Sequence, residues 1–211
     1  MSKYAAYVAN FNKEPDAFVV EMEQYAVEHH VPIMDRGGME LLIGLLRIQK
    51  SQRILEIGSA IGYSAIRIAE ALPDASVVTI ERDTDRYSKA VDFITRSGLE
   101  ERIAILEADA LLTEEAVIFG QTYDALFIDA AKGQYQRFFE KYSPTVATGG
   151  VIYCDNMFMH SAVLYEEKDI PRRNRTMIRN LKEFTRWIMD NPDYETSLLA
   201  VGDGLLIAVK K

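Results

Sequence analysis

The sequence predicts an α/β protein with a doubly wound sheet of seven strands, mostly parallel with an antiparallel C-terminal strand, and with an N-terminal helical cap. Between residues 53 and 153, five short apolar runs rich in β-branched residues alternate with helical patterns, which is typical of a parallel sheet covered on both faces. Two further runs near the C-terminus are separated by Gly202-Asp203-Gly204, a turn sequence that predicts an antiparallel pair. The first 35 residues carry helical periodicity, which predicts the cap.

The cap is expected to contain two helices, and a third helix leads into the sheet. Tyr4, Tyr7, Val8 and Phe11 fall at i, i+3, i+4 and i+7, on one face of a helix. A second helical pattern covers residues 16–29 and a third covers 38–48, ending where polar residues turn the chain. The cap therefore covers residues 1–35, within what we expect to be a single domain spanning residues 1–211.

The remaining elements follow in strict alternation until the C-terminal pair. The expected strands cover residues 53–57, 76–80, 102–106, 123–128, 150–153, 196–201 and 205–209. The expected helices between them cover residues 63–72, 83–97, 114–119, 134–146 and 174–189. No internal repeat or linker interrupts this order, which favours one cooperative unit.

Composition narrows the classes of function. The chain has 211 residues, 48% of them hydrophobic, which suffices for one substantial core. Its formal net charge of -8 disfavours diffuse binding to nucleic acid, so such a partner would need a local basic patch. The single cysteine, Cys154, excludes an internal disulfide and a cysteine-rich zinc site. No apolar run is long enough to span a bilayer, so we expect a soluble, cytoplasmic protein without a membrane partner.

The first expected strand is followed by a loop that contains glycines, Glu56-Ile-Gly58-Ser-Ala-Ile-Gly62-Tyr63-Ser64. Two glycines permit a tight turn, and the next helix presents free N–H groups that suit a carboxylate or phosphate. Glu81 ends the second strand, where a carboxylate can accept the hydroxyls of a ribose. Together these features indicate a ligand that contains a nucleoside. The loop alone is also consistent with an ordinary turn, since it lacks the G-x-G-x-x-G spacing.

Acidic and amide side chains follow the later strands. Asp109 follows the third, Asp129 and Lys132 follow the fourth, and Asp155-Asn156 follows the fifth. Ligands of open parallel sheets bind beyond the carboxyl ends of the strands, so these side chains are expected to converge. Asp129, Asp155 and Asn156 provide three oxygen ligands, a set that suits Mg²⁺. Alternatively, either aspartate caps a helix and Lys132 forms a surface ion pair with Asp129.

These motifs resemble those of the class I S-adenosylmethionine (SAM)-dependent methyltransferases of the catechol and caffeoyl-CoA O-methyltransferase type. The resemblance covers nearly the whole chain and rests on Leu55-Glu-Ile-Gly-Ser-Ala-Ile-Gly-Tyr-Ser64, Glu81, Asp129-Ala-Ala-Lys132 and Asp155-Asn156. It implies a Rossmann-like fold, Mg²⁺-dependent transfer of a methyl group from SAM to a hydroxyl, and a homodimer.

The resemblance also implies roles for individual residues. The loop from Gly58 to Gly62 and Ser64 would hold the methionine part of SAM, Glu81 the ribose, and Asp109 with Ala110 the adenine. Lys132 would be the catalytic residue, which takes the hydroxyl proton or stabilises the oxyanion. The expected SAM contacts are Met39, Glu56, Gly58, Gly62, Tyr63, Ser64, Glu81, Asp109, Ala110 and Asp129, and the expected metal ligands are Asp129, Asp155 and Asn156.

Within this family the chain is most similar to the bacterial tRNA 5-hydroxyuridine methyltransferases, through its compact cap, the segment Pro171-Arg-Arg-Asn-Arg-Thr176 and the ending Val201-Gly-Asp-Gly-Leu205. This likeness implies the 5-hydroxyl of the wobble uridine as acceptor and the tRNA anticodon region as partner. Residues 168–182 carry a local net charge of +5, which suits RNA phosphates, and RNA contacts are expected from Arg172, Arg173 and Arg175. The same charges are consistent with a solvated helix face or a subunit contact.

Other functions remain open at this stage. Small catechols or phenols are alternative acceptors, because two adjacent oxygens on a flat ring suit the same metal. A noncatalytic nucleoside-binding protein is disfavoured by the intact acidic set, and an NAD-dependent oxidoreductase by the glycine spacing. His160 follows the Asp155-Asn156 turn, and we interpret it as a bystander rather than a substrate contact.

Overall fold

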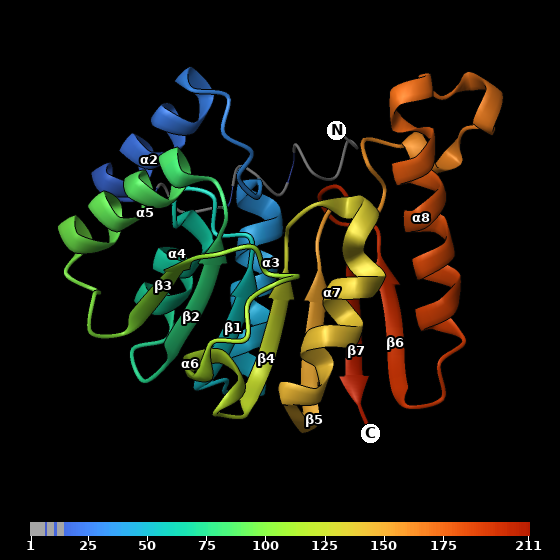
Figure 1. Cartoon of the computed structure of the whole chain (residues 1–211). Coiled ribbons are helices and arrows are strands. Elements are labelled where there is room, and N and C mark those ends of the chain that lie inside the picture. The colour runs from blue at the N-terminus through green and yellow to red at the C-terminus, as the bar shows by residue number, and fades with distance from the viewer. Residues whose placement is uncertain (1–6, 8–10, 12–14) are drawn as a thin grey trace.

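The computed structural model describes Tyr7, Phe11 and residues 15–211, and a seven-stranded sheet forms its centre (Figure 1). The strand order is β3-β2-β1-β4-β5-β7-β6. The strands are β1 (Arg53–Ile57), β2 (Ser76–Glu81), β3 (Ile103–Glu107), β4 (Tyr123–Ile128), β5 (Val146–Cys154), β6 (Tyr194–Leu199) and β7 (Leu205–Lys210). Neighbours from β3 to β5 are parallel, whereas β7 runs antiparallel to both β5 and β6. The predicted fold class is confirmed.

Helices cover both faces of the sheet. One face packs against α2 (Ala17–Glu28), α3 (Arg36–Gln49), α4 (Tyr63–Ala71) and α5 (Thr84–Ser97). The other packs against α6 (Ala116–Phe119), α7 (Tyr135–Tyr142) and α8 (Arg172–Met189). Short 3-10 turns complete the structure at η1 (Lys132–Gln134), η2 (Ser143–Thr145), η3 (Ala162–Leu164) and η4 (Glu167–Asp169).

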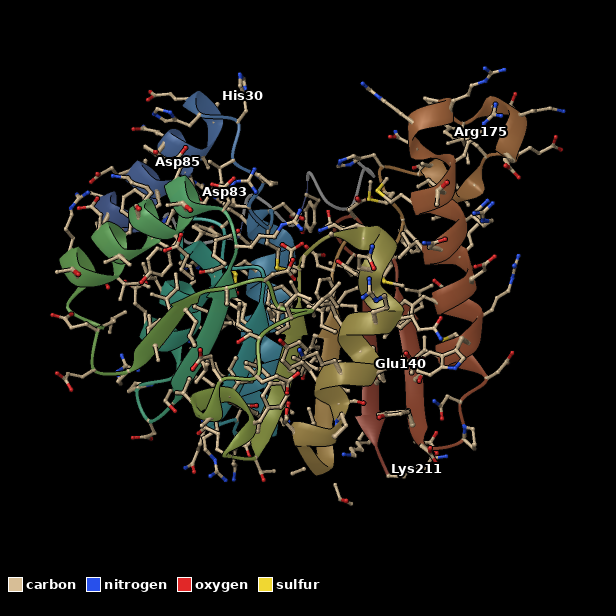
Figure 2. All side chains as sticks on the ribbon, viewed as in Figure 1. His30, Asp83, Asp85, Glu140, Arg175 and Lys211 are labelled. Carbon is tan, nitrogen blue, oxygen red and sulfur yellow. The ribbon has the colours of Figure 1, made fainter. Side chains whose placement is uncertain are left out.

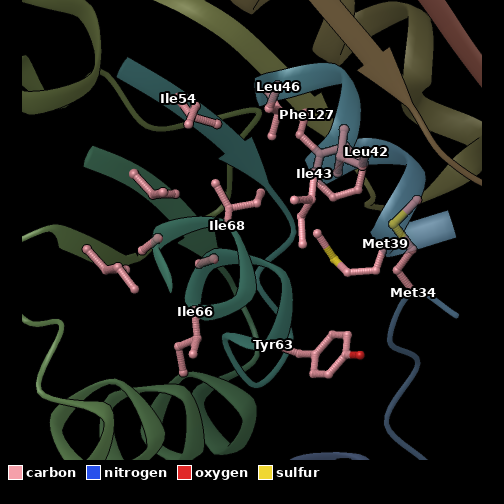
Figure 3. Packing of buried hydrophobic residues seen from close by; sticks show 14 of the residues in the cluster. Met34, Met39, Leu42, Ile43, Leu46, Ile54, Tyr63, Ile66, Ile68 and Phe127 are labelled. Carbon is pink, nitrogen blue, oxygen red and sulfur yellow. The ribbon is translucent and has the colours of Figure 1, made fainter. Parts of the chain in front are cut away.

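The strand sequences explain the two cores, because successive side chains of a strand point to opposite faces of the sheet. In β1, Ile54 packs in the core that contains α3 and α4, whereas Leu55 and Ile57 pack in the core that contains α7 and α8. Figure 3 shows the first core, in which Met39 of α3 lies near Tyr63 of α4. β1 is therefore buried on both faces from Ile54 to Ile57, and its one buried polar side chain, Glu56, lies next to the carboxyl end of the strand.

One boundary differs clearly from the prediction. The helix expected over 134–146 ends at Tyr142, and β5 begins at Val146 rather than at Gly150. Val146 pairs with Tyr123 of β4, and a register shift follows. Gly149, with φ of 77°, allows the backbone to make this irregularity within the strand. Gly149 therefore lies at an irregularity inside β5, whereas the sequence pattern predicted that the strand starts at residue 150.

The second predicted cap helix is present as α2. It begins after Asp16, whose carboxylate accepts a hydrogen bond from the first turn of the helix at 2.9 Å. Glu21 of α2 pairs with Arg96 of α5 at 2.6 Å, which ties α2 to the domain. Of the first predicted cap helix, Tyr4 and Val8 lie outside the described residues. Among the residues described, no helix has the length and apolar character that crossing a membrane requires.

Candidate active site

A cavity of about 540 Å³ opens at the carboxyl edge of the parallel strands, between the loops that follow β1 and β4. Figure 2 shows this edge, with Asp83 and Asp85 at the start of α5 on one side and Arg175 on the other. The cavity brings together most of the residues singled out from the sequence, namely Gly58, Tyr63, Ser64, Glu81, Asp109, Ala110, Asp129, Lys132 and Asn156.

Other lining residues were not predicted. They include Pro32, Ile33, Met34, Arg82, Arg86, Phe138, Met159, His160 and Met177. These side chains come from loops and helices that reach the cavity only because of tertiary packing, so spacing along the chain gave little signal for them. His160, interpreted from the sequence as a bystander, lines the cavity. The one signal in the sequence was its position four residues after Asn156.

Gly58 brings the loop after β1 against the loop after β4. Its φ of 97° lies in the left-handed region, and a Cβ at this position would overlap the backbone carbonyl of Asp129. At the other end of the loop, Gly62 is the N-cap of α4, and no described side chain caps that helix. The first turn of α4 therefore keeps N–H groups available for an anionic ligand.

Glu81 is fixed at the wall of the cavity by backbone donors. One carboxylate oxygen accepts a hydrogen bond from the Ala60 N–H at 2.7 Å, and the other accepts from the N–H groups of Arg82 and Asp83, both at 2.9 Å. These bonds tie the end of β2 to the glycine loop. Oε2 accepts only one of these bonds and keeps further acceptor capacity, so an oriented carboxylate oxygen is available to a hydroxyl-bearing ligand in the cavity.

Three predicted cofactor contacts, Met39, Gly62 and Glu56, lie beneath the cavity rather than in its lining. Met39 is fully buried in the core between α3 and α4 (Figure 3). Gly62 lies against Ile94 of α5. Met34, which precedes α3, lines the cavity.

Glu56 also lies beneath the lining and is fully buried. It accepts hydrogen bonds from the hydroxyls of Ser64 and Thr79, the latter at 2.5 Å. Burial raises the pKa of Glu56 to about 7, and the two hydroxyl donors oppose this shift. Because Ser64 does line the cavity, Glu56 acts on the cavity by orienting that hydroxyl.

The residues predicted to hold a metal lie together in one hydrogen-bonded group. Asp129 Oδ1 accepts from Lys132 Nζ at 2.5 Å and from Asn156 Nδ2 at 3.1 Å, and Asn156 Nδ2 also donates to Asp155 Oδ2 at 2.8 Å. Asp155 is buried behind the cavity lining, and burial together with the nearby charge of Asp129 raises its pKa to about 7. Tyr135 donates to the Asp155 carbonyl at 2.8 Å and fixes this strand end.

The chemistry of this group fits a hard divalent cation. Two carboxylates lie together with a single lysine, so a cation would relieve the repulsion between them. Asn156 can present its carbonyl oxygen by an amide flip. Within the part of the chain that the structure describes, no group of three or more His, Cys, Asp or Glu side chains is placed to hold a metal. A cation here would therefore also need Asn156, substrate oxygens or water as ligands.

The segment after Asn156 forms one wall of the cavity and has a strained backbone. Met159, His160 and Ser161 have φ of 45°, 52° and 69°. The left-handed region costs a non-glycine residue about 1–3 kcal/mol, so three in succession need support from outside the segment. The turn between β6 and β7 provides it, because Asp203 Oδ1 accepts the His160 N–H at 2.7 Å.

The basic segment lies on a helix. α8 begins at Arg172, two residues before the predicted start. Arg172 and Arg173 are exposed and form no hydrogen bond or ion pair with other described residues. Arg175 instead donates to two backbone carbonyls of the preceding turn, at 2.9 and 3.1 Å. Arg173 lies four residues before Met177, on the helix face of that cavity residue.

Comparisons with known proteins agree with this geometry. Residues 11–211 match the family model for O-methyltransferases. The caffeoyl-CoA O-methyltransferase of Populus kitakamiensis is 31% identical over 182 residues, 84% of this chain and 76% of that protein. A "putative caffeoyl-CoA O-methyltransferase" structure from Staphylococcus aureus has a TM-score of 0.90 and 32% identity, and covers 99% of this chain and 98% of its own. An O-methyltransferase from Bacillus cereus in complex with SAH has a TM-score of 0.82 and 26% identity, with coverage of 98% and 96%.

Proposed function

This chain belongs to the O-methyltransferase family, and we propose that it transfers the methyl group of SAM to the 5-hydroxyl of 5-hydroxyuridine at the tRNA wobble position, giving 5-methoxyuridine. The observation that carries the proposal is a cavity that joins Ser64 and Glu81 to Asp129, Lys132 and Asn156. The first pair suits a nucleoside cofactor, and the second group suits an acidic hydroxyl. Donor and acceptor would therefore meet in one place, as methyl transfer requires.

The cofactor half of the proposal rests on the glycine loop and Glu81. SAM carries its reactive methyl group on a sulfonium, between a methionine part and a nucleoside. The uncapped first turn of α4 is suited to the carboxylate of the methionine part. The Ser64 hydroxyl donates to Glu56, so its oxygen is suited to accept a hydrogen bond from the ammonium group of the same part. The carboxylate of Glu81, fixed by three backbone donors, is suited to the ribose hydroxyls. Asp109 lies on the same wall, where the base of the nucleoside would extend.

The acceptor half of the proposal rests on Lys132. Its Nζ lies 2.5 Å from Asp129 Oδ1 and lines the cavity, so the ammonium is held in one position by the carboxylate. A neutral Lys132 would take the proton of the acceptor hydroxyl at Nζ, and a charged Lys132 would stabilise the resulting oxyanion. In either role the side chain acts at the reacting oxygen.

Asp129, Asp155 and Asn156 would hold Mg²⁺ beside this lysine. When bound, the ion supplies Lewis acidity that lowers the pKa of a hydroxyl on the acceptor. The chain itself contributes the fixed strand ends, because Asp129 N–H donates to the Ile57 carbonyl at 3.0 Å and Asp155 N–H to the Ile128 carbonyl at 3.1 Å. These bonds keep the two carboxylates in register with the sheet.

The choice of RNA as substrate rests on the N-terminus of α8. Arg172 and Arg173 are exposed and unpaired among the described residues, and Arg173 shares a helix face with Met177 of the cavity. Two exposed guanidinium groups at the start of α8, the helix that contributes Met177 to the cavity lining, suit the phosphates that flank a single unstacked base. Arg175 is a weaker candidate than the sequence suggested, because it is already bound to its own backbone.

A small phenolic acceptor is the second candidate. The relatives from Populus kitakamiensis and Staphylococcus aureus carry the name caffeoyl-CoA O-methyltransferase, and the latter match covers 99% of this chain. A catechol and 5-hydroxyuridine both present two adjacent oxygens on a flat ring. Asp129, Asp155 and Asn156 with a bound cation would therefore suit either acceptor. In this proposal, the surface charge of Arg172 and Arg173 favours tRNA over a small phenol.

The test is transfer of labelled methyl from SAM to tRNA that carries unmethylated 5-hydroxyuridine, beside a catechol, each with Mg²⁺ and with a chelator. We expect chelator-sensitive incorporation into the tRNA nucleoside well above that into the catechol. Label in the catechol with silent tRNA would move the function to the phenolic candidate, and transfer that persists in chelator would remove the metal from the mechanism.

The contribution of RNA contacts is tested with the double variant Arg172→Ala/Arg173→Ala. We expect a rise in KM for tRNA of about tenfold, since each lost phosphate contact weakens binding, with catechol transfer unchanged. The matched control is Arg186→Ala/Lys211→Ala, which removes the same charge. Arg186 lies in the last turn of α8, and Figure 2 shows Lys211 at the edge of the sheet opposite Arg175. Equal losses in both double variants would assign the effect to net charge alone.

A further inference from the structure

The turn between β6 and β7, Gly202-Asp203-Gly204, lies at a junction of three parts of the molecule. The Met157 N–H donates to the Gly204 carbonyl at 3.0 Å, and the Phe158 N–H donates to the Asp203 carbonyl at 2.8 Å. On its other side, Gly202 approaches the carboxylate of Asp35, the N-cap of α3. The turn therefore connects the segment after Asn156 with the start of α3.

Both glycines of this turn are needed for that contact. A Cβ on Gly204 would lie 2.8 Å from the Phe158 ring, and a Cβ on Gly202 would lie 2.7 Å from Asp35 Oδ2. Both also have positive φ, 91° and 57°. The two glycines therefore serve the close packing of the turn against Phe158 and Asp35, and not only the hairpin itself.

The two segments that the turn connects form two walls of the cavity. Met159 and His160 line one wall, and residues 32–34, directly before Asp35, line another. Asp203 supports the first wall most directly, because its Oδ1 accepts the His160 N–H at 2.7 Å in the middle of the left-handed run. Its Oδ2 is buried, makes no hydrogen bond within the described part of the chain, and lies 3.5 Å from the His160 ring nitrogen Nδ1.

We infer that Asp203 is a positioning residue that holds the left-handed residues 159–161 within the wall formed by residues 157–161, and thereby sets the affinity for the methyl acceptor. The wall begins one residue after Asn156, at the metal group, and lies away from the Glu81 side where the nucleoside of SAM is proposed to bind. Loss of Asp203 should therefore loosen the acceptor side of the cavity and leave the cofactor side intact. The inference rests on the proposed function only for the identity of the acceptor.

The experiment compares Asp203→Ala with Asp203→Asn. The alanine variant loses the acceptor for the His160 N–H, and we expect KM for the methyl acceptor to rise about tenfold or more, with kcat changed less than about threefold and the Kd for SAH unchanged. Asparagine keeps a side-chain oxygen for that N–H, so KM should return to within about threefold of the parent value.

A matched control separates positioning from general destabilisation. Asp124 Oδ2 also accepts two backbone N–H groups, those of Gln52 and Arg53, both at 2.8 Å, but at the opposite edge of the sheet. Asp124→Ala should leave KM for the acceptor unchanged. An equal rise in KM in this variant, or a loss of SAH affinity in Asp203→Ala, would overturn the inference.

Two further measurements need neither a known acceptor nor a perfectly stable variant. Amide hydrogen exchange at residues 157–161 should become faster in Asp203→Ala than in the parent, whereas exchange around Glu81 should not change. In the same background, Ser161→Gly should slow this exchange again, since glycine adopts the left-handed φ of 69° without cost. Unchanged exchange at 157–161 in Asp203→Ala would refute the inference. If the parent enzyme methylates neither tRNA nor catechol, the proposed function fails, while exchange still decides on Asp203.

Discussion

The position of Lys132 predicts a large effect of its substitution on the rate of methyl transfer. It lines the cavity 2.5 Å from Asp129 Oδ1. We expect Lys132→Ala to lower the single-turnover rate of methyl transfer by about 10²- to 10⁴-fold, because a general base or an oxyanion partner is lost, with the Kd for SAH unchanged. Lys132→Arg should restore little, since a guanidinium does not give up its proton at any accessible pH.

The control for this prediction is Lys89→Ala on α5, which removes an ion pair with Asp92 outside the cavity lining. It should transfer methyl at the parent rate. Full activity of Lys132→Arg would show that Lys132 contributes positive charge and no proton transfer.

Glu56 makes a prediction about the pH dependence of stability. Its pKa is about 7 in the folded protein, above its ordinary value of 4.5, because burial disfavours the charge. The folded state therefore keeps a proton that the unfolded state loses, so the stabilisation is complete below pH 4.5 and is lost as pH rises toward 7. Glu56→Gln stays neutral throughout. Its free energy of unfolding, relative to the parent, should rise across this window by up to about 3 kcal/mol.

Urea unfolding of the parent and Glu56→Gln between pH 4.5 and 8 measures this difference. Asp155 also has a raised pKa, but it is present in both proteins, so its contribution cancels in the comparison. If the free energies of unfolding of the parent and of Glu56→Gln differ by the same amount at every pH in this range, Glu56 is charged in the folded protein.

At the residue scale, the sequence predicted the cavity residues that directly follow strand ends. It did not predict those that reach the cavity through tertiary packing. Glu81, Asp129 and Asn156 were predictable because parallel strands end at a common edge. Met39 was placed against the cofactor by resemblance alone, and its contact with SAM stays a prediction; its side chain is buried in the core, whereas Met34, which belongs to the same core, also lines the cavity. Which of two neighbouring methionines reaches the cavity depends on how α3 enters the fold, and spacing does not encode that.

The loop after β1 allows a test of how one element shapes the site. In Gly58→Ala the new Cβ would overlap the Asp129 carbonyl, and φ of 97° is unfavourable for alanine. We expect a loss of about 3 kcal/mol in the free energy of unfolding, together with at least a tenfold loss of SAH affinity. Urea unfolding and calorimetric titration with SAH measure the two effects.

Gly98 supplies the matched control for this loop. It ends α5 at φ of 69° with open space around the position of a Cβ. Gly98→Ala should cost about 1 kcal/mol through backbone strain alone and leave SAH affinity unchanged. Equal losses of SAH affinity in both variants would assign the effect to global stability rather than to the contact between the two loops.

At the scale of whole elements, hydrophobic patterns were sufficient where both faces of a strand are buried. β1 and β4 have the predicted bounds because their apolar residues stop at Gly58 and at Asp129. β5 and α8 do not, since their starts depend on a bulge at Gly149 and on a helix that begins directly after Pro171. A glycine or a proline in the sequence indicates that the backbone is irregular at that point. It does not specify whether the irregularity is a bulge, a turn or the start of a helix.

At the scale of the whole molecule, a net charge of -8 opposes a polyanionic substrate, and the +5 of residues 168–182 must overcome it locally. Some of these positively charged side chains already form contacts within the protein. Lys168 pairs with Glu166 at 2.6 Å, and Lys182 donates to the Tyr165 carbonyl at 3.0 Å. Among the described residues of this segment, the side chains of Arg172, Arg173 and Arg179 form no hydrogen bond or ion pair, and Arg173 shares a helix face with Met177 of the cavity.

This distribution predicts how salt affects the two candidate substrates. Methyl transfer to tRNA should fall steeply as salt rises, because each phosphate contact releases counterions, whereas transfer to a neutral catechol should change little. In Arg172→Ala/Arg173→Ala, the slope of log(kcat/KM) against log salt for tRNA should become shallower by about 1 to 2 units. The slope in Arg186→Ala/Lys211→Ala should match that of the parent. A parent slope near zero for tRNA would mean that the enzyme does not read the phosphate backbone, and a phenolic acceptor would then be the better assignment for this cavity.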